Sequence, residues 1–271
     1  MNKIKFTKMV GTGNNFVVID NRNQGQSKNN EDWSKMARIL CPRKKGVGAD
    51  GLLILECSDK ADFRMRVINA DGSEAEMCGN GLRCAAMYAY RDKKHLKIET
   101  LAGLYEADIT GKDQVKIKME GPKDLRPDID INVSGRQLKV NYIDTGVPHA
   151  VIFVQGLDEI DVDIIGEAVR YHAEFKPRGT NVDFAEIADN KNIKIRTYER
   201  GVEGETLACG TGAVASAIMS NKKQQTEDKL NVYTKGGILK VYFKTVGPEV
   251  TDVYLEGEAK EVYSGEADYY V

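Results

Sequence analysis

The sequence predicts a protein of the α/β class, of the α+β type, made of two similar lobes that each curve a sheet around a helix. An internal repeat is the main observation behind this prediction. The segment Cys78-Gly79-Asn80-Gly81 recurs as Cys209-Gly210-Thr211-Gly212, and a glutamate stands four residues before each cysteine. Farther along, residues 96–100 resemble residues 230–234 at nearly the same spacing. Small apolar residues on several faces of the helix after each cysteine fit a helix packed inside a curved sheet.

The composition is that of a globular protein that binds a small molecule. The chain has 271 residues, of which 41% are hydrophobic and 30% charged, enough for two modest domains. Lysine and arginine (39) nearly balance aspartate and glutamate (41), so there is no strong field to attract nucleic acid or an anionic membrane. No apolar run is long enough for a signal peptide or a membrane-spanning helix, and a cytoplasmic location is expected. The sequence does not fix the oligomeric state, and a homodimer is compatible with it.

The cysteines predict free thiols in a reducing compartment. There are five, an odd number, and no two are spaced as Cys-x-x-Cys. This pattern argues against a disulfide framework and against a structural zinc site. No metal ligand set is therefore expected.

The elements of the first lobe, residues 1–121, follow from periodicity and turn signals. They are expected in this order: a strand at 4–6, a turn at 11–15 with Asn14 at a hairpin tip, a strand at 16–20, a helix at 30–40 ended by Pro42, strands at 52–56 and 63–68, a loop at 69–73, a helix at 79–92, and strand pairs at 95–108 and 115–119.

The second lobe is expected over residues 122–259. Prolines and charges at 120–127 are typical of a linker, and the boundary is placed there. The elements that follow are strands at 138–144, 150–154, 182–187 and 193–198, a helix near 161–172, a helix at 210–220 and a hairpin through 230–255. Residues 260–271 are expected to return to the first lobe.

The repeated motif combines a thiol with a site for an anion. A thiolate is the basic form of cysteine, and a helix N-terminus stabilises its charge. The glycines after each cysteine expose backbone N–H groups that can bind a substrate carboxylate. For one isolated Cys-Gly-x-Gly the usual explanation is a small buried residue with packing glycines. The recurrence of the motif favours two functional thiols, Cys78 and Cys209.

Two thiols on opposite faces of a carbon can invert it. A single base returns a proton to the face it left, whereas a thiolate and an opposed thiol can remove the proton from one face and deliver a proton to the other. The predicted reaction is inversion at the α-carbon of an amino acid without a cofactor. The helix N-termini would hold its carboxylate and stabilise the charge that develops in the transition state.

Several other residues are candidates for the site, each with a simpler structural explanation. His149 stands on a turn and could tune a thiol, although a lone histidine is usually structural. Glu199-Arg200 ends a strand ten residues before Cys209 and could bind an ammonium or a carboxylate, or form a common surface ion pair. Asn14, Asn69 and Asn181 all lie in turns, where asparagine is favoured for its backbone alone.

The motifs together resemble those of the diaminopimelate epimerase family over essentially the whole chain. The matching segments are Lys8-Met9 through Phe16, Asn69-Ala70-Asp71-Gly72-Ser73 leading to Cys78 through Arg83, Pro148-His149, Gly179-Thr180-Asn181, and Glu199-Arg200-Gly201 leading to Cys209-Gly210-Thr211-Gly212. The resemblance implies cofactor-independent interconversion of LL- and meso-diaminopimelate, in the formation of lysine and peptidoglycan precursors. It also implies two pseudo-symmetric lobes, each a curved, mainly antiparallel sheet around a central helix, with the active site in the cleft between them.

The resemblance also assigns roles to individual residues. Cys78 and Cys209 match the acid/base pair, and His149 and Glu199 match residues that adjust thiol ionisation. The positions that match substrate contacts are Asn14, Asn69, Gly79, Asn80, Asn181, Glu199, Arg200, Gly210 and Thr211.

Three departures concern recognition of the distal end of the substrate. Asn15 stands where the family often has aspartate, Val147 where it often has asparagine, and Gly51 where it often has glutamine. The alternatives are a two-cysteine racemase of proline or hydroxyproline, a non-catalytic amino-acid-binding protein, and a cysteine hydrolase. The last would need only one nucleophilic thiol.

Overall fold

The computed structural model describes residues 2–22, 32–90, 93–133, 135–223 and 225–269. The chain divides into two compact units. Unit 1 consists of Met1–Ile117 with Gly257–Val271, and unit 2 of Lys118–Glu256. The sequence expectation places these divisions after residues 121 and 259. Among the described residues, no helix has the length and apolar character needed to cross a membrane.

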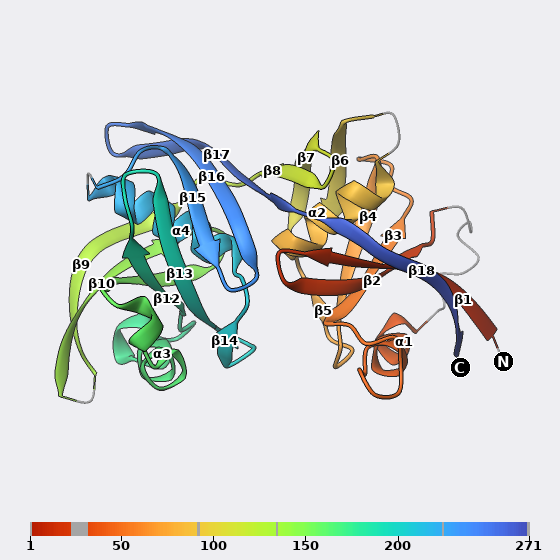
Figure 1. Cartoon of the computed structure of the whole chain (residues 1–271), viewed down its shortest axis with the longest axis horizontal. Coiled ribbons are helices and arrows are strands. Elements are labelled where there is room, and N and C mark those ends of the chain that lie inside the picture. Colours follow the sequence, from red (N-terminus) through yellow and green to blue (C-terminus); the bar gives the residue numbers. More distant parts are fainter. Residues whose placement is uncertain (1, 23–31, 91–92, 134, 224, 270–271) are drawn as a thin grey trace. The chain divides into compact units, whose positions relative to one another are not determined.

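Unit 1 contains two helices and a sheet, drawn in red to yellow with the blue β18 in Figure 1. Its elements are β1 (Asn2–Gly11), β2 (Asn14–Asp20), α1 (Trp33–Leu40), β3 (Gly51–Glu56), β4 (Phe63–Asn69), β5 (Glu74–Ala75), α2 (Gly79–Ala89), β6 (His95–Thr100), β7 (Gly103–Gly111), β8 (Gln114–Lys118) and β18 (Lys260–Tyr269).

Unit 2 contains the green and blue elements of Figure 1. They are β9 (Lys123–Val133), β10 (Arg136–Asp144), β11 (Pro148–Phe153), the short 3-10 helix η2 (Leu157–Glu159), α3 (Val162–Arg170), the short 3-10 helix η3 (Ala173–Phe175), β12 (Asn181–Ile187), β13 (Asn192–Glu199), β14 (Gly204–Thr206), α4 (Gly210–Lys222), β15 (Lys229–Thr234), β16 (Gly237–Val246) and β17 (Glu249–Glu258).

The two units repeat one order of strand pairing. In unit 1, β1–β2 is antiparallel, β2–β3 parallel, β3–β4 antiparallel, β4–β6 parallel and β6–β7 antiparallel. In unit 2, the same order holds for β10–β11, β11–β12, β12–β13, β13–β15 and β15–β16. The predicted internal repeat is therefore a repeat of topology, and the predicted α+β class is confirmed.

A helix lies inside the sheet of each unit. Helix α2 contacts β1, β2, β3, β4, β6, β7 and β18, and α4 contacts β10, β11, β12, β13, β15 and β16. A helix can touch that many strands of one sheet only if the sheet curves around it. Small side chains allow this close approach, since Ala85, Ala86, Ala213 and Ala217 are all fully buried.

The outer face of each sheet is covered by a second helix. In unit 1, Trp33, Met36 and Leu40 of α1 pack with Val17 and Leu52 in one hydrophobic cluster. In unit 2, residues of α3 pack in the same way on β12 and β13. Strands covered on both faces give the continuous runs of buried residues seen in β2, β3, β11 and β12.

The structure differs from the sequence expectation in four places. The segment expected as a linker at 120–127 enters β9 at Lys123. The short strands β5 and β14 were not expected. The β1–β2 turn consists of Thr12 and Gly13, both with positive φ, as two-residue hairpin turns require. Asn14 is consequently the first residue of β2 and pairs with Gly11, instead of standing at the tip. Helix α1 begins at Trp33, and residues 23–31 lie outside the described part.

Candidate active site

Each repeated cysteine is the residue that begins a helix, as predicted. Cys78 precedes α2 and Cys209 precedes α4, both in extended backbone conformation. Each sulfur accepts a hydrogen bond of 3.4 Å from the backbone N–H of the glycine three residues later, Gly81 or Gly212. The sulfur thus satisfies one of the N–H groups that a helix leaves unpaired at its start. The other N–H groups and the helix dipole favour a negative charge beside it.

The glutamates of the repeat hold the strand that leads to each cysteine. Glu74 in β5 accepts two hydrogen bonds of 2.8 Å from the guanidinium of Arg66, and Glu205 in β14 accepts two of 2.8 Å from Arg196. These paired contacts are the strongest geometry for an arginine and a carboxylate. They fix each short strand against the neighbouring long strand, β4 or β13, just before the chain turns into the helix.

In unit 1, a chain of polar side chains runs from the first turn of α2 to the start of β2. Arg83 donates to Asn80 Oδ1 and, at 2.9 Å, to Thr12 Oγ1. Asn80 Nδ2 donates to Asn14 Oδ1, and Asn14 Nδ2 donates to Asp50 Oδ2 at 3.3 Å. Because the guanidinium can only donate and the carboxylate here accepts, the two ends fix the orientation of both amides. Asn14 and Asn80, two of the predicted substrate contacts, are thus in direct contact.

Asn69, another predicted contact, lies at the end of β4. Its side-chain amide donates to Ser73 Oγ at 3.0 Å, within the loop that follows the strand. It pairs in the sheet with Gly51. A Cβ atom on Gly51 would lie 2.7 Å from the backbone oxygen of Ile68. A glutamine at this position would therefore require the backbone to shift.

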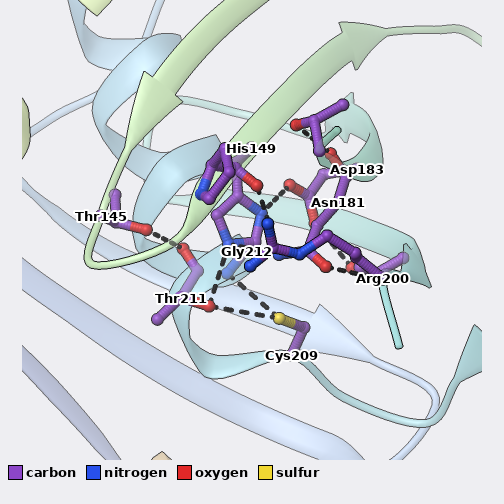
Figure 2. A network of polar contacts seen from close by, with 11 residues as sticks. Thr145, His149, Asn181, Asp183, Arg200, Cys209, Thr211 and Gly212 are labelled. Carbon is purple, nitrogen blue, oxygen red and sulfur yellow. Dashed lines mark hydrogen bonds and ion pairs between the residues drawn. The ribbon is translucent and has the colours of Figure 1, made fainter. Parts of the chain in front are cut away.

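In unit 2, five of the predicted residues form one network with the buried carboxylate of Asp183 (Figure 2); they are His149, Asn181, Arg200, Cys209 and Thr211. His149 is fully buried, and its Nδ1 lies 2.7 Å from Asp183 Oδ2. Its Nε2 lies 2.9 Å from Thr211 Oγ1 and 3.4 Å from the amide of Asn181. Thr211 Oγ1 lies 3.4 Å from Cys209 Sγ. A continuous polar path thus connects the Asp183 carboxylate with the thiol.

Asp183 is itself fixed from a second side. Its other oxygen, Oδ1, accepts a 2.7 Å hydrogen bond from Thr197 Oγ1. Because the carboxylate accepts at Oδ2, His149 Nδ1 carries a proton, and a neutral ring then accepts at Nε2. Thr145 Oγ1 donates to the backbone oxygen of Thr211 at 3.1 Å and holds the first turn of α4 beside the ring.

The Glu199-Arg200 pair contributes in two different ways. The backbone N–H of Arg200 donates to Asn181 Oδ1 at 2.8 Å, while its guanidinium donates to the backbone oxygen of Arg178 at 3.0 Å. Burial lowers the pKa of Arg200, and the neighbouring guanidinium groups lower it further. Burial raises the pKa of Glu199, and the imidazole of His149 partly opposes this rise.

Burial dominates the ionisation of Cys209, which is 7% exposed. It raises the pKa of this thiol well above the ordinary value, and the carboxyl groups of Glu199 and Asp183 raise it further. The hydrogen bonds from Thr211 and from the Gly212 N–H act in the opposite direction. From the sequence, only the stabilising effect of the helix N-terminus on the thiolate was expected. Loss of hydration outweighs that effect for Cys209.

The remaining cysteines are free, like the first two. Burial raises the pKa of Cys41 to about 11 and that of Cys84 to about 12, so both stay protonated near neutral pH. Cys57 is exposed and donates to the backbone oxygen of Arg22 at 2.7 Å. Among the residues that the structure describes, no three His, Cys, Asp or Glu side chains are grouped so as to hold a metal ion.

Sequence reasoning assigned no role to Asp183 or Arg83, and both are fully buried. Asp183 had one detectable signal, because it is a charged residue between the apolar Val182 and Phe184 and shares a strand face with Asn181. Arg83 lies on α2, where most of the other side chains are small or apolar. A charge in such a context is a candidate for function because charges are rarely buried without one.

The family model described as diaminopimelate epimerase matches residues 6–125 and 141–262, which include both cysteines and both networks. The chain belongs to the diaminopimelate epimerase family. Curated relatives with that name support the assignment over nearly full length. The one from Archaeoglobus fulgidus is 42% identical, covering 97% of this chain and 96% of the relative. The one from Caldanaerobacter subterraneus subsp. tengcongensis is 40% identical, covering 98% and 100%.

Solved structures of low sequence identity share the fold of this family member. A Bacillus anthracis phenazine biosynthesis protein of the PhzF family matches with a TM-score of 0.75 at 18% identity, over 99% of this chain and all of that one. A probable proline racemase from Agrobacterium radiobacter K84 matches with a TM-score of 0.70 at 14% identity, over 99% and 93%. At such identities the likeness establishes the fold alone.

Proposed function

We propose that this chain interconverts LL- and meso-diaminopimelate by moving the α-proton with two thiols, Cys78 and Cys209. The observation that carries the proposal is the matched pair of helix starts. In two units of one topology, a cysteine caps the helix that lies inside the sheet. The chain's membership of the epimerase family supplies the substrate class.

The proposed reaction begins with one thiolate and one thiol on opposite faces of the α-carbon. The thiolate takes the α-proton, so that a C–H bond breaks and an S–H bond forms. The opposed thiol then gives its proton to the other face and becomes the thiolate. Charge is conserved, the centre is inverted and no cofactor is needed. After one turnover the two sulfurs have swapped protonation states. The reverse reaction, or proton transfer with water, restores the starting protonation states.

The helix N-termini are proposed to bind the carboxylate at the reacting centre. The N–H groups at Gly79, Asn80, Gly210 and Thr211 lie in the first turns of α2 and α4. They would stabilise the negative charge that spreads onto the carboxylate as the proton leaves. The ordered amides of unit 1 and of Asn181, with Asn69, Glu199 and Arg200, are the proposed polar contacts for the rest of the substrate.

A cytoplasmic location is proposed because the cysteines form no disulfide bonds. All five are free, including the exposed Cys57. Free exposed thiols are typical of reducing compartments. The proposal includes no protein partner beyond a homodimer, and no nucleic acid or membrane partner.

The decisive experiment is an assay of the purified full chain with LL-diaminopimelate and no added cofactor, followed by chiral chromatography. We expect meso-diaminopimelate to form. In heavy water the inverted α-carbon should carry deuterium, because the donating thiol exchanges with solvent. Cys78→Ala and Cys209→Ala should each lower the turnover rate at least about 1000-fold, since neither thiol can replace the other.

Two controls make the assay specific. Cys57→Ala removes an exposed thiol outside both networks and should keep full activity. L-Proline and trans-4-hydroxy-L-proline test the runner-up function. Racemisation of either compound without turnover of diaminopimelate would replace the proposed substrate. Binding of diaminopimelate that survives both alanine variants, with no turnover by the unsubstituted chain, would indicate a binding protein.

A further inference from the structure

The two thiols occupy matched backbone positions but unlike electrostatic surroundings. The strand registers pair Phe16 with Gly51 in unit 1 and His149 with Asn181 in unit 2. Two residues farther along, Leu53 in β3 therefore corresponds to Asp183 in β12. The glycines of the repeat confirm this match, because a Cβ on Gly81 would meet Leu53 and one on Gly212 would meet Asp183. Unit 1 thus has apolar residues where unit 2 has an imidazole and a carboxylate.

The charge in unit 1 has the opposite sign and lies on the helix. Arg83, five residues after Cys78, is fully buried, and its Nε and Nη1 have no hydrogen-bond partner. Among the described residues no carboxylate forms an ion pair with it. The residue five positions after Cys209 is Val214, which is buried and apolar. Burying a guanidinium without a counter-charge is unfavourable, so a nearby anion would be strongly favoured.

Two thiols share a helix with that charge, Cys78 as the residue that caps α2 and Cys84 as the residue next to Arg83. Burial lowers the pKa of Arg83 to about 10, and the sulfurs of Cys84 and Cys78 oppose the change. The attraction is mutual, so the guanidinium favours a thiolate on either residue. Cys84 is excluded as the anion because burial raises its pKa to about 12. Cys78, which is partly exposed, remains.

Other charged groups packed near the start of α2 are already engaged. Asp50 accepts hydrogen bonds from Asn15 as well as Asn14, and Arg43 lies 3.6 Å from its other oxygen. Arg66 is bonded to Glu74. These groups partly neutralise one another, as does the buried Lys8 ammonium beside Asp50, whereas no carboxylate among the described residues pairs with Arg83.

We propose that the two units hold their thiols in opposite states before substrate binds, with Arg83 favouring the thiolate of Cys78, and Asp183 with Glu199 keeping Cys209 protonated. Arg83 acts here as a positioning residue, since it works through the sulfur and through Asn80. His149 lies between Asp183 and Thr211, with Nδ1 2.7 Å from Asp183 Oδ2 and Nε2 2.9 Å from Thr211 Oγ1. The inference rests on the proposed function only in naming Cys78 as the first base.

The test measures the ionisation of each thiol in the substrate-free full chain. Alkylation by iodoacetamide is followed at constant ionic strength from pH 5 to 10, and the pH midpoint of the rate is taken for each sulfur. Accessibility changes the rate but not the midpoint. Trypsin separates the two sites, because the peptides 67–83 and 201–222 each contain one cysteine, Cys78 or Cys209.

We expect the midpoint of Cys78 to lie at least about one pH unit below that of Cys209. Arg83→Met should raise the Cys78 midpoint by about one pH unit or more, the usual effect of losing a close opposite charge, and leave Cys209 unchanged. Arg83→Lys should restore most of the difference. Asp183→Asn should lower the midpoint of Cys209 alone. In Arg83→Met the merged peptide 67–91 also contains Cys84, and fragment ions assign the label.

The outcomes separate this inference from the proposed function. A pH midpoint for Cys209 equal to or below that of Cys78 overturns the inference. This comparison needs only the unsubstituted chain, so it can be made even if Arg83→Met does not fold. A Cys78 midpoint that Arg83→Met and Arg83→Lys leave unchanged also overturns it. If the midpoints differ as expected but diaminopimelate is not epimerised, only the proposed function fails.

Discussion

The glycines at the start of α2 and α4 allow one substitution to be compared at two matched positions. Gly81 and Gly212 are each the third residue of their helix and donate to the sulfur that caps it. Replacing either glycine by alanine improves helix propensity by about 1 kcal/mol. Any difference between the two variants must therefore come from what the new Cβ meets.

The surroundings of the new Cβ differ sharply. On Gly81 it would lie 3.0 Å from a Leu53 methyl group and 3.4 Å from Cys78 Cβ, so a small movement of a flexible side chain relieves the contact. On Gly212 it would overlap Asp183 Oδ1 and lie 3.1 Å from Asp183 Cγ. That carboxylate is anchored at 2.7 Å by both Thr197 and His149.

The magnitudes follow from these contacts. Overpacking costs about 1–3 kcal/mol, and weakening hydrogen bonds to a charged group costs about 1.5–3 kcal/mol more. After the helix gain, Gly212→Ala should lose about 2–4 kcal/mol of unfolding free energy. Gly81→Ala should stay within about 1 kcal/mol of the unsubstituted protein. For a denaturant slope of about 3 kcal/mol/M, the larger loss lowers the urea midpoint by about 1 M.

Urea unfolding is followed by far-ultraviolet circular dichroism, which detects both units, and by fluorescence of Trp33, the single tryptophan, which lies in unit 1. Gly212→Ala should shift the dichroism transition. The double variant with Asp183→Ala isolates the clash, because the cost of Gly212→Ala should fall below about 1 kcal/mol once the carboxylate is gone. An equal cost with and without Asp183, or equal losses for both glycine variants, would refute the reasoning.

Three further predictions follow from the ionisable groups. Burial raises the pKa of Glu199, so the stability it contributes is present below the unfolded pKa of about 4.3 and is lost as the pH rises through the folded pKa. Glu199→Gln should raise the melting temperature at pH 7.5 more than at pH 4, and an equal gain would contradict this. Cys41 and Cys84 have pKa values of about 11 and about 12 in the folded protein, against about 8.5 in the unfolded chain. Each should therefore lower the unfolding free energy by about 1.4 kcal/mol per pH unit between pH 9 and 10.5. In urea titrations across this pH range, the unfolding free energy of Cys41→Ala should fall less steeply with pH than that of the unsubstituted protein. Thr211→Val breaks the link between His149 and Cys209 and should lower kcat/KM about 10–100-fold, whereas Thr211→Ser should keep it.

Local signals in the sequence were enough to place the cysteines. A thiol followed by glycines and then by small residues at helical spacing predicts a helix start, and the structure confirms one at Cys78 and one at Cys209. The repeated glutamates also correspond to a repeated contact in the structure, because Glu74 and Glu205 form equivalent ion pairs with Arg66 and Arg196. Their arginine partners lie on other strands, so the sequence showed the repeat but not its cause.

A strand that depends on pairing with its neighbour was missed. Strand β9 contains Pro127 and has positive φ at Asp124 and Asp128, which locally resemble a linker. It forms because β10 supplies hydrogen-bond partners along its length. Proline is compatible with a strand at an edge or beside a bulge, and the β9–β10 register shifts near this segment. Sequence periodicity alone cannot detect a strand whose stability comes from its neighbour.

The buried charges are the part of the site that the sequence could not assign. The duplicated topology fixes where each sulfur lies relative to its helix, but not the field around it. That field depends on positions such as Arg83 and Asp183, which are far in sequence from the partners they touch. A two-thiol epimerase also needs its sulfurs to exchange states in each turnover. A difference in ionisation that favours one resting state must therefore be small enough for bound substrate to reverse. The raised pKa of Glu199 offers a way, because protonation of this carboxyl would remove one of the two negative charges that oppose a thiolate at Cys209.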